Sequence, residues 1–396
     1  MGQTNSSRKN SFAVKDSQLT NFDFGFDVVH SDYDSYYEKL ISIYSTLDRA
    51  TFENIFGDYF GKPLWDFYTT RSDMVEISKE LFIRKTRLLF SNNYGIFLQI
   101  FPTINELLNA CFIGANIELL EDDKEIIKQI KEQMVLTKAG KDGKSGILIW
   151  IQRNCPRLLV PLQVKIINSI IGKPMINYDF TSSLLTKAQM FLVKSALNPI
   201  TYLNVQGSSI FNENGINNWA RLYSSIDHNI SVTRFEHYVF DYKRPTISIF
   251  KLNNNQLCVL ALDTEWKHSS NKYGSSFTTF ISIKPKFFRT VRSNSLYSNF
   301  LLKTSQKGIT FDDLLSINED FSNVVAIEAW GVVDEVNIFE QEKQKEFHKQ
   351  DVLKNQKFHI QNAFNDLKIN KLRGKSFDEG ESTKTHENIF HKSSEN

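Results

Sequence analysis

The fold is decided by a central stretch that opens Trp219-Ala220-Arg221-Leu222-Tyr223-Ser224-Ser225 and runs on to Thr246-Ile247-Ser248-Ile249-Phe250. In the second run, Ile247 and Ile249 fall on one face. This period of two predicts a strand over 246–251, because successive side chains of a strand point to opposite faces. Pro245 stands at its start, where a missing N–H is tolerated. The stretch therefore indicates a β-sheet in the second half of the chain.

Further strand patterns follow in order. An Asn-Asn-Asn turn at 253–255 and an apolar run at 257–262 predict a hairpin with the first strand. Runs at 277–283 and 324–330 also read as strands, and residues 184–196 read as a helix leading into them. We therefore expect an α+β unit with antiparallel strands over residues 182–334.

Each distinctive residue of this unit has a structural explanation. Leu222, Tyr223 and Phe235 suit the apolar anchors of a helix–turn element. Either Ser224 or Ser225 can cap the following turn. Trp330, on the last predicted strand, can fill a core of the sandwich type.

The ordered series of motifs resembles the TLDc domain. It comprises an opening Leu-Tyr-Ser-Ser with a following His, Ser and Phe, a Pro-Thr strand, a Tyr-Gly strand and a closing Glu-x-Trp-Gly. The residues that carry the resemblance are Leu222, Tyr223, Ser224, His228, Phe235, Pro245, Thr246, Gly274, Phe280, Glu328, Trp330 and Gly331. The sequence departs from the pattern at Asn229 and Arg244, where glycine is expected, and in a glycine-rich segment reduced to Gly308 and its neighbours. The resemblance implies a β-sandwich with flanking helices.

The N-terminal half reads differently. Residues 1–25 are polar and predict a disordered arm. Between 30 and 175, apolar residues recur at helical spacing over 74–91, 104–120, 124–135 and 162–171. We expect an all-α region that precedes the sheet.

The C-terminal part is polar apart from one apolar stripe. Leu353, Ile360, Phe364 and Leu367 fall at offsets that place them on one face of a helix over 335–373. Two interpretations stay open, because this face can dock into a partner or pack against the helical region of the same chain. Residues 374–396 predict a disordered tail.

The N-terminal Met-Gly-Gln-Thr-Asn-Ser fits the pattern for N-myristoylation at Gly2. The alternative is a chance match. A single myristoyl chain gives only reversible membrane binding. We therefore expect conditional association with a membrane surface, in which a protein partner is also needed.

The long helical region and Gly2 narrow the resemblance to the fungal restriction of telomere capping protein 5 family, and more distantly to myristoylated, lysosome-associated TLDc proteins of animals. This resemblance implies a cytoplasmic protein, partly peripheral on the vacuole membrane, that binds subunits of the vacuolar proton-pumping ATPase. The link to telomere capping is genetic and does not itself suggest contact with DNA.

Composition excludes several classes of protein. Of 396 residues, 41% are apolar and 23% are charged, which permits a packed core, and a net charge of +2 argues against a nucleic-acid partner. Three distant cysteines, Cys111, Cys155 and Cys258, form no CxxC pair, which argues against disulfides and a zinc site. We find no secretory signal and no apolar stretch long enough to span a membrane.

The sequence does not favour an enzyme. Ser224, Ser225, His228, His237, Asp241 and Cys258 offer suitable residue types, but no nucleophile motif surrounds them. Asp263 and Glu265 are expected to face water, and the aspartates near 23 and 27 do not follow the calcium-loop pattern. We expect no catalytic residue, no cofactor and no metal. The alternative function is oxidative-stress protection through a thiol, although Cys258 lies in an apolar strand, where a thiolate is disfavoured.

Overall fold

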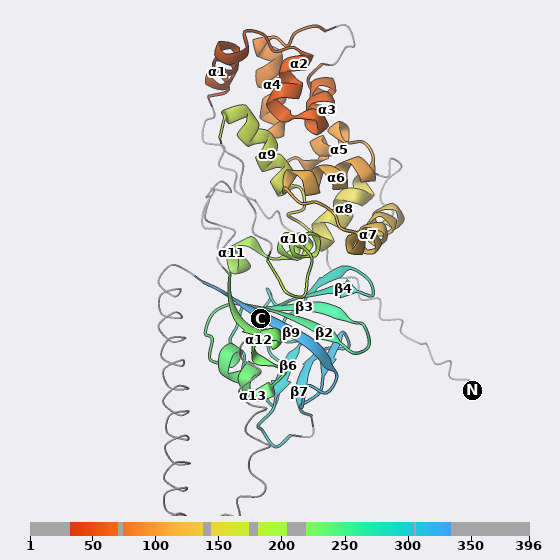
Figure 1. Ribbon diagram of the computed structural model, residues 1–396, viewed down its shortest axis with the longest axis vertical. Coiled ribbons are helices and arrows are strands. Elements are labelled where there is room, and N and C mark those ends of the chain that lie inside the picture. The colour runs from red at the N-terminus through yellow and green to blue at the C-terminus, as the bar shows by residue number, and fades with distance from the viewer. Residues whose placement is uncertain are drawn as a thin grey trace, which may run out of the picture. The chain divides into compact units, whose positions relative to one another are not determined.

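The computed structural model describes residues 32–69, 74–137, 144–173, 181–203, 219–304 and 306–333 (Figure 1). The arm predicted at 1–25, the helix predicted at 335–373 and the tail at 374–396 lie outside these ranges. Within them, the expected α+β organisation is confirmed, because a helical region precedes two antiparallel sheets.

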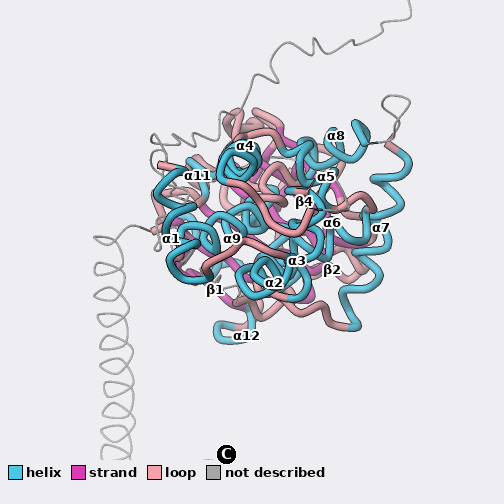
Figure 2. Tube along the Cα trace, turned by 90° about the horizontal axis from the view of Figure 1, so that it is seen from above, coloured by secondary structure: helices cyan, strands magenta, loops and turns pink. Residues whose placement is uncertain are grey.

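The helical region is built from short helices. Its α-helices are α1 (Tyr33–Tyr44), α2 (Arg49–Phe56), α3 (Asp58–Tyr68), α4 (Lys79–Leu89), α5 (Phe97–Ile100), α6 (Ile104–Gly114), α7 (Lys124–Leu136), α8 (Lys144–Asn154) and α9 (Val160–Ile171). Of these, α1, α2, α4 and α6 begin with a side-chain cap. Helix α9 packs against α1, α2, α4 and α6 (Figure 2). Pro161 lies in the first turn of α9 and Gly172, with φ 70°, ends the helix, as their residue types favour.

Local capping explains where the predicted helix limits were wrong. Helix α4 begins at Lys79 rather than near 74, because the Ser78 side chain accepts a hydrogen bond from the backbone N–H of Leu81. Helix α10 (Lys187–Ala196) begins after Thr186, which forms a reciprocal capping box with Gln189. Helix α6 ends at Gly114 because the chain turns at Asn116, where φ is 56°.

The larger sheet has six antiparallel strands in the order β1-β9-β2-β3-β4-β5. They are β1 (Trp219–Ser224), β2 (Thr246–Leu252), β3 (Leu257–Leu262), β4 (Thr279–Lys284), β5 (Phe288–Val291) and β9 (Val324–Val332). Strand β9 lies between β1 and β2, with Trp219 opposite Val332 and Thr246 opposite Gly331. The predicted hairpin of β2 and β3 is confirmed, with Ile249 opposite Val259.

A smaller sheet has three antiparallel strands in the order β6-β7-β8. These are β6 (Leu296–Asn299), β7 (Gly308–Phe311) and β8 (Leu315–Ile317). Between β1 and β2 the chain forms two short helices, α12 (Ser225–His228) and α13 (Val232–Phe235), and a π-helical turn η4 (Glu236–Phe240).

The six-stranded sheet is buried on both faces. One face, which includes Ile247, Ile249 and Val259, packs in a core shared with the helices. The other, which includes Phe250, Leu260 and Ile327, packs in a second core with Leu296 and Phe311 of the smaller sheet. Strand β3 is buried at all six positions, which accounts for its continuous apolar run.

Two sequence interpretations differ from this arrangement. Leu222 and Tyr223 lie in strand β1 rather than in a helix–turn element. Trp330 does not fill the core between the two sheets, because it projects from β9 into the core shared with the helices. Its neighbour Ala329 occupies the core between the sheets, as the alternation of a strand requires.

Helix α10 joins the helical region to the sheets. All residues from Ala188 to Ala196 are buried. On one side the Phe191 ring meets the Phe112 ring of α6 at 5.3 Å, and α10 also packs against β4. Helix α11 (Pro199–Tyr202) follows. In the described part of the chain no single helix combines the length and apolar composition of a membrane span, and one bent pair, Tyr94–Ile100 with Ile104–Gly114, meets both only when taken together.

Candidate functional site

The first half of the motif series is one local structure at the end of β1. The Tyr223 hydroxyl donates to the Asn229 carbonyl at 2.5 Å and accepts from the Ser231 N–H at 3.2 Å. The Tyr223 ring stacks on His228 and meets Phe235 edge-on at 5.6 Å. Through these contacts, Tyr223 of β1 holds α12 and α13 against the sheet.

The two serines of this motif bind backbone. Ser224 caps α12, because its side chain accepts from the Ile226 N–H at 3.3 Å. The Ser225 hydroxyl accepts from the Ile327 N–H of β9 at 3.0 Å. Of the two capping alternatives, the structure selects Ser224 for α12.

His228 is not arranged to activate Ser224 as a nucleophile. Its Nδ1 accepts the backbone N–H of Ser224 at 3.2 Å, so this nitrogen does not face the hydroxyl as a base. Partial burial lowers the pKa of His228, which favours the neutral imidazole at pH 7. Through its hydrogen bond with Ser224 and its stacking on Tyr223, His228 stabilises the turn that follows β1.

Glu328 is an acidic residue that lies fully buried in the domain. Its side chain is fully buried on β9, and it accepts hydrogen bonds from the Ser183 N–H at 3.2 Å, the Ser183 hydroxyl at 3.0 Å and the Ser182 hydroxyl. Arg221 of β1 lies 3.9 Å from Glu328 and 3.0 Å from Asp227. Glu328 therefore fastens the segment before α10 to the last strand.

Gly331, on the same strand, lies against the ring of Tyr242, which leaves no space for a side chain. A Cβ atom on Gly331 would lie 2.5 Å from two ring carbons of Tyr242. The Tyr242 hydroxyl donates to the Val332 carbonyl at 2.6 Å. Among the residues that the structure describes, the buried indole N–H of Trp330 has no hydrogen-bond partner.

The Pro-Thr and Tyr-Gly motifs complete the series; the second is not a strand, because Tyr273 forms only one isolated bridge, with Leu296, and β4 begins at Thr279. Thr246 is buried and accepts the indole N–H of Trp266 at 2.8 Å, while the Pro245 carbonyl accepts from the Val332 N–H at 2.9 Å. Gly274 has φ 115°, a conformation that favours glycine. Phe280 stacks on Phe311 at 5.5 Å and so joins the two sheets.

The remaining candidates for chemistry are dispersed. Cys258 is fully buried, and burial raises the pKa of its thiol far above the ordinary value. His237 and Asp241 form an exposed pair at 3.5 Å. Asp263 accepts from the Ser275 hydroxyl at 2.5 Å and Glu265 pairs with Lys243 at 3.1 Å, so they do not act as one carboxylate pair.

No group of three His, Cys, Asp or Glu side chains that could hold a metal occurs in the described ranges. Gly2, Leu353, Ile360, Phe364 and Leu367 lie outside those ranges, as do Asp23 and Asp27. The described motif residues, most of which are buried, form a packed and hydrogen-bonded framework, and within it His228 is not placed as a base for Ser224.

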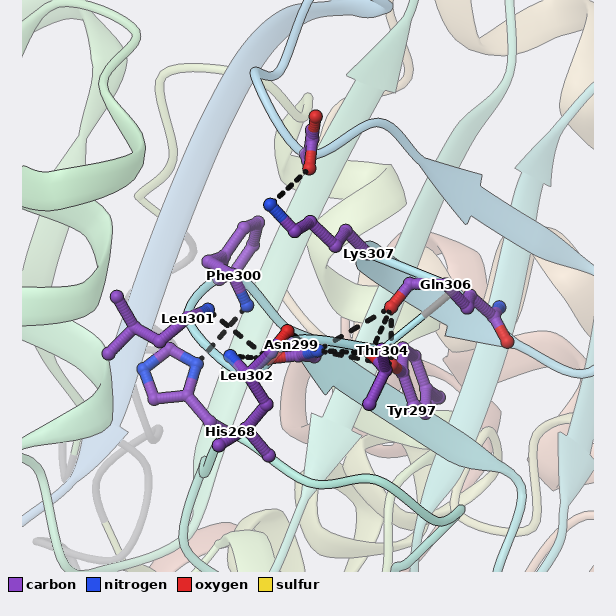
Figure 3. Close-up of polar contacts among 10 residues, drawn as sticks. His268, Tyr297, Asn299, Phe300, Leu301, Leu302, Thr304, Gln306 and Lys307 are labelled. Carbon is purple, nitrogen blue, oxygen red and sulfur yellow. Dashed lines mark hydrogen bonds and ion pairs between the residues drawn. The ribbon is translucent and has the colours of Figure 1, made fainter.

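Sequence reasoning missed two polar features. The Tyr202 hydroxyl lies 3.0 Å from the Ala261 carbonyl and 2.9 Å from the Phe277 carbonyl, which share its one proton, and the Tyr202 carbonyl accepts from the Trp219 indole N–H at 2.6 Å. Asn299, the last residue of β6, forms a second hydrogen-bonded centre with the loop that follows (Figure 3). Neither has a local sequence signal. The partners of Tyr202 are far away in the sequence, and those of Asn299 lie mostly on irregular backbone whose path a sequence pattern does not predict.

The comparisons with known proteins bear on the whole second half of the chain. No curated protein matches this sequence. The model of the TLDc domain matches residues 180–363, which include every motif residue described above and also Leu353 and Ile360. On this match, the chain contains a TLDc domain at residues 180–363.

Proposed function

We propose that this protein is a non-catalytic regulatory protein that binds subunits of the vacuolar proton-pumping ATPase. The observation that carries the proposal is the TLDc domain at residues 180–363. The polar motif residues support it, because Tyr223, Ser224 and Glu328 are all engaged in holding backbone segments together. A domain built in this way offers a rigid surface for a partner.

The proposal places the protein in the cytoplasm and peripherally on the vacuole membrane, as a member of the restriction of telomere capping protein 5 family. Myristoylation at Gly2 would supply reversible membrane contact, and pump subunits would supply the second contact that stable attachment needs. The genetic link of that family to telomere capping would then be indirect.

The test is capture from vacuolar membranes with wild-type protein and with Gly2→Ala, read by mass spectrometry. We expect pump subunits to be enriched by the wild type and strongly depleted in the Gly2→Ala sample. If neither form enriches a pump subunit, the assigned partner is wrong, whatever the fold.

The partner contact is assigned to the predicted helix face of Leu353, Ile360, Phe364 and Leu367. Replacing Ile360 and Phe364 by Asp should abolish capture of pump subunits and leave the melting temperature unchanged, because a partner-facing stripe does not contribute to the protein's own core. Asn362→Asp adds a carboxylate to the opposite face of the same helix and should leave capture intact. A large fall in melting temperature for the double variant would instead indicate that the face packs against its own chain.

The alternative function is protection against oxidative stress through a weak thiol-dependent activity. All three thiols are fully buried, and burial raises their pKa values, so the reactive thiolate is scarce. For this reason we favour the binding function. Peroxide consumption by the purified protein that disappears in Cys258→Ser would reverse that preference.

A further inference from the structure

The loop after β6 presents two neighbouring leucines to solvent. Leu301 is 70% exposed and Leu302 is 41% exposed. The loop follows β6 of the smaller sheet. That sheet packs in a core that also contains residues of β2, β3, β4 and β9. Isolated exposed leucines are common on protein surfaces. Here two adjacent leucines are exposed in one loop and together form an apolar patch that could contact a partner.

Asn299 fixes the backbone that carries these leucines (Figure 3). Its side chain is fully buried. Its Oδ1 accepts from the N–H groups of Leu301 and Leu302 at 3.2 and 2.8 Å, and its Nδ2 donates to the Leu302 carbonyl at 3.1 Å and the Thr304 hydroxyl at 2.7 Å. The backbone at Leu301 and Leu302 is therefore held with both side chains outward, and turning them into the core would break these bonds.

The base of the loop is anchored as firmly. The Phe300 N–H donates to Nδ1 of His268 at 3.2 Å, and the Phe300 ring meets the Phe321 ring at 5.7 Å. Phe300 thus points inward while Leu301 and Leu302 point outward. A surface group that is already ordered loses little conformational entropy when it binds.

The loop itself carries lysines and no acidic residue. Between Asn299 and Gly308 the sequence contains Lys303 and Lys307 and neither Asp nor Glu. Lys303 is exposed, and Lys307 pairs with Glu319 at 3.2 Å. On the adjoining segment, Lys267 is exposed, and its carbonyl accepts from the Ser298 hydroxyl at 2.7 Å. Glu236 on the other side faces His268 at 3.1 Å.

We propose that Leu301 and Leu302 insert into an anionic lipid surface while Lys303 stays at the level of the lipid phosphates. Aliphatic side chains enter the boundary between headgroups and acyl chains, and lysines extend along their stems to reach the phosphates. The absence of acidic residues from the tip sequence favours a lipid surface of negative charge over an acid-rimmed or neutral protein pocket. This contact is separate from Gly2 and does not require the pump.

The experiment uses the full chain produced without acylation and vesicles that contain no protein. We expect cosedimentation with phosphatidylcholine vesicles that contain phosphatidylserine, and little with phosphatidylcholine alone. Replacing Leu301 and Leu302 by Asp should reduce binding by about tenfold or more, because both apolar insertions are lost and two negative charges are added. The matched control is Ile226→Asp, which changes a residue of 66% exposure elsewhere on the domain and should leave binding unchanged.

Charge and depth have their own readouts. Lys303→Glu should weaken binding to anionic vesicles by about fivefold, whereas Lys251→Glu, at an exposed position of β2, should not. A polarity-sensitive dye on Leu301→Cys should shift to the blue on anionic vesicles, and the three native thiols are buried away from the label. The proposal is overturned if the wild type does not bind anionic vesicles, if the double leucine variant binds as the wild type does, or if the dye remains in water.

Discussion

At the scale of the residue, Gly331 is the clearest case of a motif position explained by packing. Gly331→Ala would place a Cβ atom 2.5 Å from the Tyr242 ring and displace the hydroxyl that donates to Val332. We expect unfolding to become easier by about 2 kcal/mol, from overpacking and a lost hydrogen bond. Urea unfolding measures it. In a Tyr242→Ala background the same change should cost little, and an equal cost there would contradict this explanation.

Asn229 carries backbone strain in the same domain. Its φ of 57° and ψ of 170° lie near a region that glycine adopts far more readily than other residues, and the TLDc pattern has glycine at this position. Asn229→Gly should therefore stabilise the protein by about 0.5–1 kcal/mol in thermal or urea unfolding. Asn229→Ala should destabilise it, because alanine tolerates a positive φ less well than asparagine does. A loss of stability in the glycine variant would mean that the asparagine side chain matters more than its backbone.

At the scale of the element, Glu328 joins the segment before α10 to strand β9. Glu328→Ala removes the acceptor for Ser182 and Ser183 inside a buried site, so a loss of about 3 kcal/mol or more is expected. Glu328→Gln keeps one acceptor oxygen and should cost less. Hydrogen exchange should show faster opening of the amides at 183–185.

The comparison for that prediction is Glu319→Gln. Glu319 pairs with Lys307 at 3.2 Å, but its side chain is 55% exposed, so removing its charge should cost no more than about 1 kcal/mol. Equal losses in the Glu319 and Glu328 variants would show that the buried carboxylate does not fasten the segment.

The turn between β7 and β8 is stabilised by ion pairs of Asp312 that depend on pH. Although burial opposes it, hydrogen bonds from Lys272 and Arg292 hold the pKa of Asp312 at about 2. Because this pKa is below the ordinary value of 3.8, the contribution is complete above about pH 4 and is lost as the pH falls towards 2. With partial exposure to solvent, it amounts to about 1 kcal/mol.

The check is urea unfolding of wild type and Asp312→Asn across that range. The difference in unfolding free energy should be present at neutral pH and shrink between about pH 4 and 2. A difference that does not change with pH would mean that the carboxylate charge plays no part.

At the scale of the whole molecule, the helical region and the six-stranded sheet share one core. Helix α10 is buried between them, with Phe191 against Phe112 and the Cys155 thiol 3.8 Å from the Leu192 carbonyl. A fragment of residues 181–396 would expose the face of α10 that α6 covers. We expect this fragment to bind a hydrophobic dye and to self-associate in size-exclusion chromatography, unlike the full chain.

A monomeric fragment that binds no dye and melts at the temperature of the full chain would contradict this view. It would mean that the TLDc domain folds without its helical partner. The shared core predicts the opposite, and it also predicts a single unfolding transition for the full chain.

How much could be predicted from sequence depends on the range of the interaction. Strand β3 was predicted at its observed limits, because its apolar run and the turn at Asn253–Asn255 are local signals. The start of α4 was missed because the cap at Ser78 competes with an apolar pattern that continues upstream. Leu222 and Tyr223 were assigned to a helix–turn element because β1 pairs only with β9, a hundred residues later, and their own neighbours do not announce a strand.

The sequence by itself determined the α+β class, the hairpin of β2 and β3, the last strand β9 and the motif series of the TLDc domain, since periodicity, turns and motif order are written in neighbouring residues. Only the tertiary structure decided that Trp330 faces the helices, that Glu328 is bound by Ser182 and Ser183, and that Asn299 holds Leu301 and Leu302 outward. Those arrangements depend on which face of a strand meets which partner and on the path of irregular backbone. Both are settled by the packing of segments that lie far apart in the chain.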